Sequence, residues 1–180
     1  MAETSTDVIK RYLEDAIAAE KSFETQLQGF AKEGDDAAAK AAFHQHALET
    51  KQQYERLTAR LESLGGSTSG IKSFLAHVFG LSPKAAQVGH EEEERTTQNL
   101  MMAYAVENSE MAMYEALATV AEAAGDSQTA TLAREIQAEE KATAEKVWKL
   151  IPSSAVESFE RLTGGSTTGT AASGRTASAY

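Results

Sequence analysis

The 180-residue chain contains no cysteine, which excludes disulfide bonds and thiolate metal sites. Any bound metal ion must therefore be held by carboxylates, histidines or amides. No segment approaches the roughly 20 consecutive apolar residues of a membrane span. The first residues, MAETSTDV, have neither a basic start nor an apolar signal core. We therefore expect a cytoplasmic protein with no membrane partner.

Basic residues are in the minority, with 17 lysines and arginines against 27 acids, for a formal net charge of −10. A partner with a phosphate backbone calls for a basic stripe, and the sequence has none. We therefore expect no nucleic acid partner. An acidic surface instead raises the local concentration of cations.

Proline occurs only at Pro83 and Pro152, while alanine, glutamate and glutamine are plentiful, as long helices require. Apolar residues recur at helical spacing in four segments. We predict helices over about residues 7–31, from Asp36 to about Leu64, from about Glu91 to Ala124, and from Ser127 to Pro152.

The connections predict an all-α four-helix bundle. Short turns at Gly34 and Gly125 make the helices of each pair antiparallel. Between the pairs we expect one long crossover, about Gly65 to Gly89, with a short apolar helix at Ile71 to Val78. We expect Pro152 to end the fourth helix. A short fifth helix, SSAVESFERL, would then cap the bundle with Val156, Phe159 and Leu162.

We assign residues 1–162 to this bundle and residues 163–180 to a Gly/Ser/Thr-rich tail. The tail sequence, TGGSTTGTAASGRTASAY, has too little apolar surface to fold alone.

Glutamates interrupt the apolar faces of all four long helices near their middles. The candidates are Glu20, Glu49, Glu107, Glu110, Glu139 and Glu140. Antiparallel helices bring together residues equally far from their shared turn, and Glu110 and Glu140 are equally far from Gly125. Glu20 and Glu49 are nearly equidistant from the first turn, so the carboxylates can meet at one level.

Several buried carboxylates are costly unless cations neutralise them, so metal binding explains the whole set economically. Each glutamate taken singly has another interpretation, as a surface residue or as the partner of a lysine such as Lys141. Tyr54, Tyr104 and Tyr114 lie near the predicted level, and core packing is the first interpretation of their role.

The segments LEDAIAAEKSFETQL, HALETKQQYERL, AYAVENSEMAMYEAL and LAREIQAEEKATAEKV resemble, in that order, the four helices of the bacterial YciE/YciF family of ferritin-like proteins. The resemblance covers about residues 7–150. It implies a ferritin-like bundle, an association with stress responses, a dimer and two bound metal ions. It also implies Glu20, Glu49, Glu107 and one of Glu139 or Glu140 as ligands, with Glu110 beside them.

The chain departs from the ferritin-like pattern at histidine. Such sites place a histidine one turn after the glutamates of the second and fourth helices, but Gln52 or Gln53 and Ala142 or Thr143 stand there. His46, one turn before Glu49, is one candidate replacement ligand, and a glutamine is another. His46 could equally be a partly exposed partner of a neighbouring acid.

Two functions follow as hypotheses. The first is a di-metal protein, with iron as the first expectation and manganese as the second, that oxidises ferrous iron or consumes peroxide under stress. The second is a metal-free structural bundle whose tail engages neighbouring subunits or a partner. The chain is expected to form a homo-oligomer, a dimer or larger, in either case. Whether it is an enzyme stays open at this point.

Overall fold

The computed structural model describes residues 3–70 and 89–165, and within them it contains four long α-helices and no strand. The helices are α1 (Ser5–Phe30), α2 (Ala37–Ser63), α5 (Arg95–Ala123) and α6 (Ser127–Thr163). Two short 3₁₀ turns, η1 (Thr68–Gly70) and η2 (Glu92–Glu94), flank the connection between the halves. The predicted all-helical fold with four long helices is confirmed.

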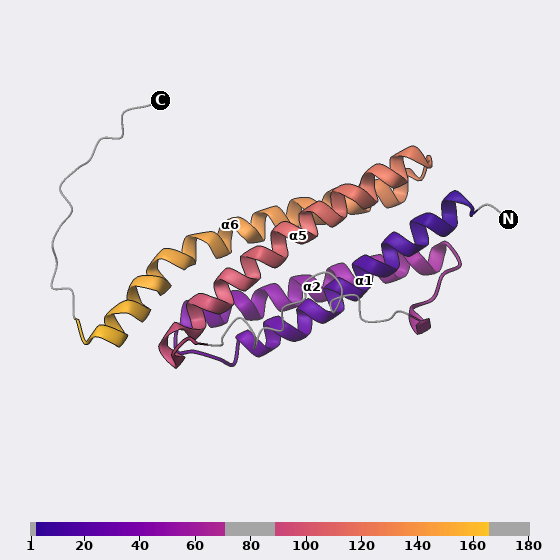
Figure 1. Ribbon diagram of the computed structural model, residues 1–180. Coiled ribbons are helices and arrows are strands. Elements are labelled where there is room, and N and C mark those ends of the chain that lie inside the picture. Colours follow the sequence, from indigo (N-terminus) through magenta and orange to yellow (C-terminus); the bar gives the residue numbers. More distant parts are fainter. Residues whose placement is uncertain (1–2, 71–88, 166–180) are drawn as a thin grey trace, which may run out of the picture.

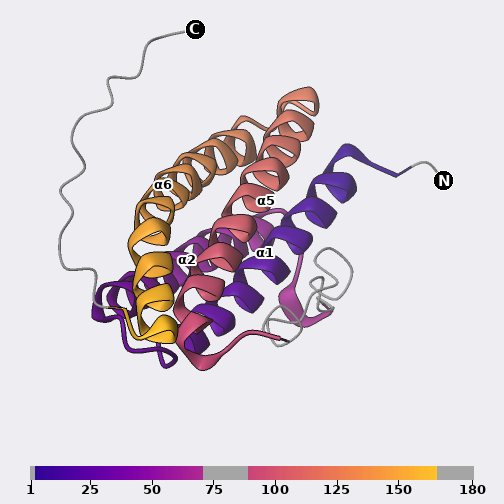
Figure 2. The same cartoon turned by 60° about the vertical axis from the view of Figure 1, so that its left-hand side comes forward.

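The two helical hairpins, α1 with α2 and α5 with α6, lie side by side (Figures 1 and 2). Across the hairpins, α1 packs against α5 and α2 packs against α6. Both hairpin turns use a glycine with positive φ, 67° at Gly34 and 76° at Gly125, a conformation that glycine adopts without steric cost. Among the described helices, none is long and apolar enough to cross a membrane.

The helix starts are fixed by local side chains. A capping box between Thr4 and Asp7 begins α1. The Asp36 carboxylate accepts the backbone N–H groups of Ala38 (2.8 Å) and Ala39 (3.1 Å) at the start of α2. Asp126 caps α6 in the same way, and its carboxylate also accepts from Arg60 of α2 at 2.6 and 2.7 Å. The Arg60 contact therefore ties the two hairpins together at one end of the bundle.

The prediction of a separate fifth helix is wrong, because α6 continues through Pro152 to Thr163. Proline removes one N–H from the helix ladder, and α6 is visibly curved (Figure 2). Hydroxyl contacts hold the helix beyond the proline: Ser154 Oγ and Ser158 Oγ lie 2.8 and 3.0 Å from Thr97 Oγ1 of α5.

The residues expected to cap the bundle from that segment are exposed instead. Val156 is 55% exposed, Phe159 62% and Leu162 45%, so these side chains do not cover the core. The buried face of this part of α6 carries Ser154 and Ser158.

The connection from α2 to α5 lies largely outside the described residues, which includes the predicted helix at Ile71 to Val78. In Figure 1, η1 and η2 lie at opposite ends of the bundle. Most of the chain between them lies outside the described residues, so the long crossover stays a prediction. The tail from residue 166 also lies outside the described residues.

The apolar core consists of two clusters. The first surrounds the α5–α6 turn end and contains Ile9, Leu13, Ala16, Ile17, Leu57, Leu61, Tyr114, Leu117, Ala118, Ala133 and Ile136. The second lies toward the α1–α2 turn and contains Phe23, Leu27, Phe30, Ala39, Phe43, Ala47, Leu100, Ala103, Val106 and Val147. On every helix, polar residues in the stretch between the two clusters are buried, which places a polar layer across the middle of the bundle.

Candidate metal centre

Five ionisable side chains make up this polar layer, which we call the acidic layer. All five are at most 4% exposed, and they come from all four helices: Glu20, His46, Glu107, Glu110 and Glu140. Each replaces an apolar residue in the inward stripe of its helix, so packing of the two flanking clusters forces it inside. Among the described residues, no lysine or arginine is buried, so no basic side chain neutralises the layer from within.

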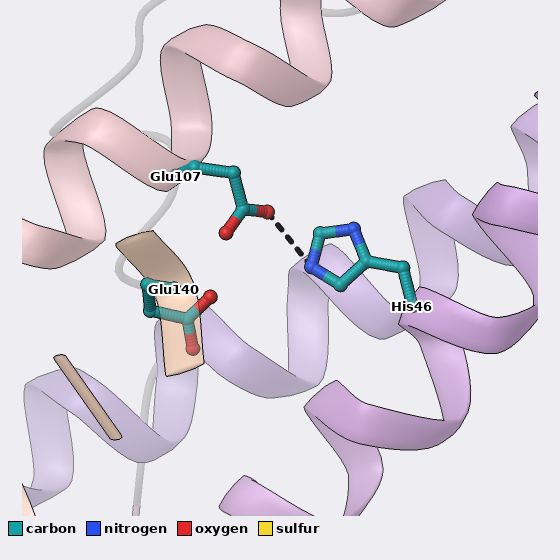
Figure 3. A group of neighbouring side chains, drawn as sticks. All are labelled: His46, Glu107 and Glu140. Carbon is teal, nitrogen blue, oxygen red and sulfur yellow. Dashed lines mark ion pairs between the residues drawn. The ribbon is translucent and has the colours of Figure 1, made fainter. Parts of the chain in front are cut away.

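Two groups of three ligand atoms lie within the layer. His46, Glu107 and Glu140 each offer one atom within 4.8 Å of the other two, and Glu20, Glu110 and Glu140 form a second such group. Figure 3 shows the first group, with His46, Glu107 and Glu140 facing a common point from α2, α5 and α6. Glu140 belongs to both groups, so it is the carboxylate best placed to bridge two ions.

Most ligand atoms of the layer lack a hydrogen-bond partner. The unpartnered atoms are Glu20 Oε2, both ring nitrogens of His46, both carboxylate oxygens of Glu107 and of Glu110, and Glu140 Oε1. His46 Nε2 lies 2.7 Å from Glu107 Oε1, but the contact does not have hydrogen-bond angles. Buried polar atoms are normally satisfied by protein groups, water or an ion, so these oxygens and nitrogens are available to hold a ligand.

Tyr114 fixes one member of the layer. Its hydroxyl donates a short hydrogen bond to Glu20 Oε1, and the phenol ring is completely buried in the first apolar cluster. The bond occupies one Glu20 oxygen and leaves Oε2 without a partner. Tyr114 therefore orients Glu20, in addition to the packing role expected from the sequence.

Burial shifts every titration in the layer toward the neutral form. It raises the pKa of the Glu107 carboxyl to about 8, and it raises the pKa values of Glu20, Glu110 and Glu140 well above 4.5. Neighbouring carboxylates raise the pKa values of these three further. Burial lowers the pKa of His46 to about 4, so its imidazole is neutral at pH 7, the form that binds metals.

Two of the six predicted glutamates lie outside the layer. Glu139 is 46% exposed in its side chain and accepts hydrogen bonds from Arg56 Nη1 at 2.7 and 2.9 Å. Glu49 is 32% exposed, accepts from Gln45 Nε2 at 3.1 Å, and lies 3.8 Å from Lys146 Nζ. The structure therefore brings Glu20, Glu107, Glu110, Glu140 and His46 together in the layer. Glu49 and Glu139 lie at the surface.

Two further buried side chains of α2 border the layer, and one of them, Gln53, is among the glutamines considered from the sequence as a replacement ligand. Gln53 is buried and donates from Nε2 to Glu139 Oε2 at 3.2 Å, with its Oε1 unpartnered. Thr50 is buried with an unpartnered hydroxyl. Both continue the inward face of α2 beyond His46, Thr50 after four residues and Gln53 after seven.

The fold and the acidic layer define a helical bundle with a candidate dinuclear centre. Residues 4–160 match the family described as "Domain of unknown function (DUF892)". Protein YciF of Escherichia coli is 34% identical over 145 residues, which cover 78% of this chain and 86% of YciF. The chain therefore belongs to this family, and the resemblance to the YciE/YciF proteins is confirmed.

Solved structures of other proteins have a similar fold. The crystal structure described as that of the E. coli stress protein YciF has a TM-score of 0.75 and 29% identity, covering 87% of this chain and 99% of that chain. A protein from Xanthomonas campestris pv. campestris has a TM-score of 0.73 and 28% identity, covering 88% and 98%. YcfI from Rhodopseudomonas palustris, provisionally described as a structural protein, has a TM-score of 0.71 over 81% of this chain and 93% of YcfI. At 24% identity it supports the fold alone.

Proposed function

We propose that the chain is a ferritin-like protein that binds two divalent metal ions in the acidic layer, with iron as the first candidate and manganese as the second. The observation that carries the proposal is the set of four buried glutamates with orphaned oxygens and no buried basic partner among the described residues. Carboxylates with a single imidazole suit both metals.

The donors divide into two sets that share Glu140. His46, Glu107 and Glu140 would hold one ion, and Glu20, Glu110 and Glu140 would hold the other. A pair of ferrous ions held there would supply two electrons for the reduction of dioxygen or peroxide and would become ferric in the process. YciF is described as a stress protein, which supports a role of this chain in a stress response.

The chain's own residues prepare the layer for cations. The two apolar clusters exclude water from both sides, which strengthens electrostatic interactions inside. His46 presents a neutral imidazole, while Tyr114 holds Glu20 in place. Because burial raises the pKa values of these carboxyls and so favours their protonated form, a binding cation would displace protons.

The rival proposal is a metal-free structural bundle whose glutamates are neutralised by bases. That description fits Glu49 and Glu139, which contact Lys146 and Arg56. It does not explain the four buried glutamates. A homo-oligomer is compatible with both functions, and the exposed apolar side chains of α6, Trp148 and Phe159 among them, support one.

Elemental analysis separates the two functions. The protein, purified without chelators, would be loaded anaerobically with Fe²⁺ or Mn²⁺, desalted and compared with a Glu20→Gln, Glu107→Gln double variant. A matched control is Glu62→Gln, Glu145→Gln, which removes the same charge from exposed positions. We expect about two ions per chain in the wild type and the control, and fewer than one in the layer variant. Wild-type protein that retains no metal after loading would support the structural function.

A further inference from the structure

A depression of about 240 Å³ lies on the surface between α2 and α6. Its lining contains two acids, two bases and three smaller or neutral side chains: Glu49, Gln52, Arg56, Glu139, Ala142, Thr143 and Lys146. The two acids are the glutamates that the structure leaves outside the acidic layer. Two larger depressions lie elsewhere on the surface. One is lined by the α1–α2 turn, η2 and the end of α6, and the other extends from the α5–α6 turn along α6 to Ala138.

Polar atoms continue from this depression toward the acidic layer. Thr143 lines the depression, is buried, and lies with its Oγ1 3.5 Å from Glu49 Oε2. Thr143 also follows Glu140 by three residues on α6, so it lies on the same face of the helix. The depression and the His46, Glu107 and Glu140 group are therefore one helical turn apart.

Gln53 makes the second connection. It is 2% exposed, and its Nε2 donates to Glu139 Oε2 at the wall of the depression. Its Oε1 has no hydrogen-bond partner, and neither does Oγ1 of the neighbouring buried Thr50. Carbonyl and hydroxyl oxygens replace water around hard ions. The Gln53 side chain contacts Glu139 through its Nε2, and its unpartnered Oε1 is therefore suited to bind a cation in transit.

We propose that this depression is the access route of the acidic layer, in which Glu49 and Glu139 first bind a hydrated divalent cation and Gln53 and Thr143 pass it inward. The inference rests on the proposed metal-binding function. Arg56 and Lys146 neutralise the two surface acids when no cation is bound, through contacts of 2.7 and 3.8 Å. An arriving cation competes with these bases, so the route favours divalent ions over monovalent ones.

The rate of metal uptake tests the route separately from the capacity of the site. Metal-free protein would be mixed with Co²⁺ by stopped flow, with a fluorescent indicator that reports free Co²⁺. The variants are Glu49→Gln, Glu139→Gln and Ala142→Arg, the last placing a bulky cation in the depression. The matched controls are Glu145→Gln and Ala116→Arg at exposed positions that do not line it. Circular dichroism verifies that each variant is folded.

We expect each glutamine variant to slow uptake roughly threefold and Ala142→Arg to slow it about tenfold, while the final content stays at two ions per chain. Arg56→Gln should accelerate uptake, since it removes a competing cation. Uptake rates equal to those of the controls would overturn the access route. A variant of Glu49 or Glu139 that binds fewer ions at equilibrium would also overturn it, because that residue would then be a ligand. A wild type that takes up no Co²⁺ would refute the metal-binding function itself.

Discussion

Glu140 is the residue on which the geometry of the proposed metal centre depends. It is 1% exposed and supplies a ligand atom to both groups of the acidic layer. Its neighbour Glu139 turns to the surface, where Arg56 of α2 holds it. The sequence could not choose between the two, since both follow Ile136 at helical spacing. The choice is made by the packing of α6, and Arg56, more than 80 residues away in the chain but adjacent in the bundle, binds the residue left outside.

The shared position of Glu140 makes a stoichiometric prediction. Glu140→Gln removes a donor from both groups, so we expect fewer than one ion per chain after loading. Glu110→Gln and His46→Ala each remove a donor from one group, so about one ion per chain should remain. Isothermal titration with Mn²⁺ measures the stoichiometry. Equal losses in all three variants would contradict the assignment of Glu140 to both ions.

At the scale of the helices, local sequence determined most of the architecture. The turns at Gly34 and Gly125 and the apolar stripes were sufficient to predict four helices and their pairing. The end of α6 was not predictable from local rules. Pro152 normally ends a helix, but contacts of Ser154 and Ser158 with Thr97 stabilise the continued helix. Those contacts depend on tertiary packing against α5, which the local pattern around a proline does not contain.

The Arg60 and Asp126 contact predicts how much one helix start contributes to stability. Asp126→Ala removes both the cap of α6 and the partner of Arg60, with both side chains only 14% exposed. We expect a loss of about 2 kcal/mol in the free energy of unfolding. Asp126→Asn keeps the cap and should lose less. Urea unfolding measures both, with Glu145→Ala as an exposed control. A loss in Asp126→Ala no larger than in the control would show that this end of the bundle is held by other contacts.

At the scale of the whole molecule, two apolar clusters enclose an acidic layer, and burying carboxyl groups in it costs folding free energy. The sequence indicated that six glutamates could point inward at one level. Glu20, Glu107, Glu110 and Glu140 do so together, and Glu49 and Glu139 do not. It did not indicate that His46 is fully buried beside Glu107, because a histidine at the edge of a stripe is as readily exposed. Whether a residue at the edge of an inward stripe is buried depends on how the neighbouring helix packs against it. A single sequence carries little information about that packing.

The raised carboxyl pKa values predict the pH dependence of stability. Glu107 has a pKa near 4.5 when unfolded and about 8 when folded, so the folded protein retains a proton that the unfolded chain has lost between these values. The free energy of unfolding of metal-free protein should therefore fall as pH rises from 7 to 8. Each carboxyl that stays protonated in the folded protein contributes about 1.4 kcal/mol per pH unit. Above pH 7 His46 contributes little, since it is neutral in both states.

Thermal unfolding with and without Mn²⁺ measures this dependence. We expect the melting temperature of metal-free protein to fall across that range, and Mn²⁺ to reduce the fall, because bound cations replace the protons. Glu110→Gln should flatten the metal-free curve by removing one of the raised carboxyls. A metal-free melting temperature that rises from pH 7 to 8 would contradict the assignment of raised pKa values to the layer.

Anomalous diffraction at the manganese absorption edge, from crystals grown with Mn²⁺, tests the central claim most directly. The account predicts two anomalous peaks inside the bundle, one bonded to His46, Glu107 and Glu140 and the other to Glu20, Glu110 and Glu140. Crystals that contain Mn²⁺ only at surface carboxylates, with the four buried glutamates bonded to each other or to water, would contradict it.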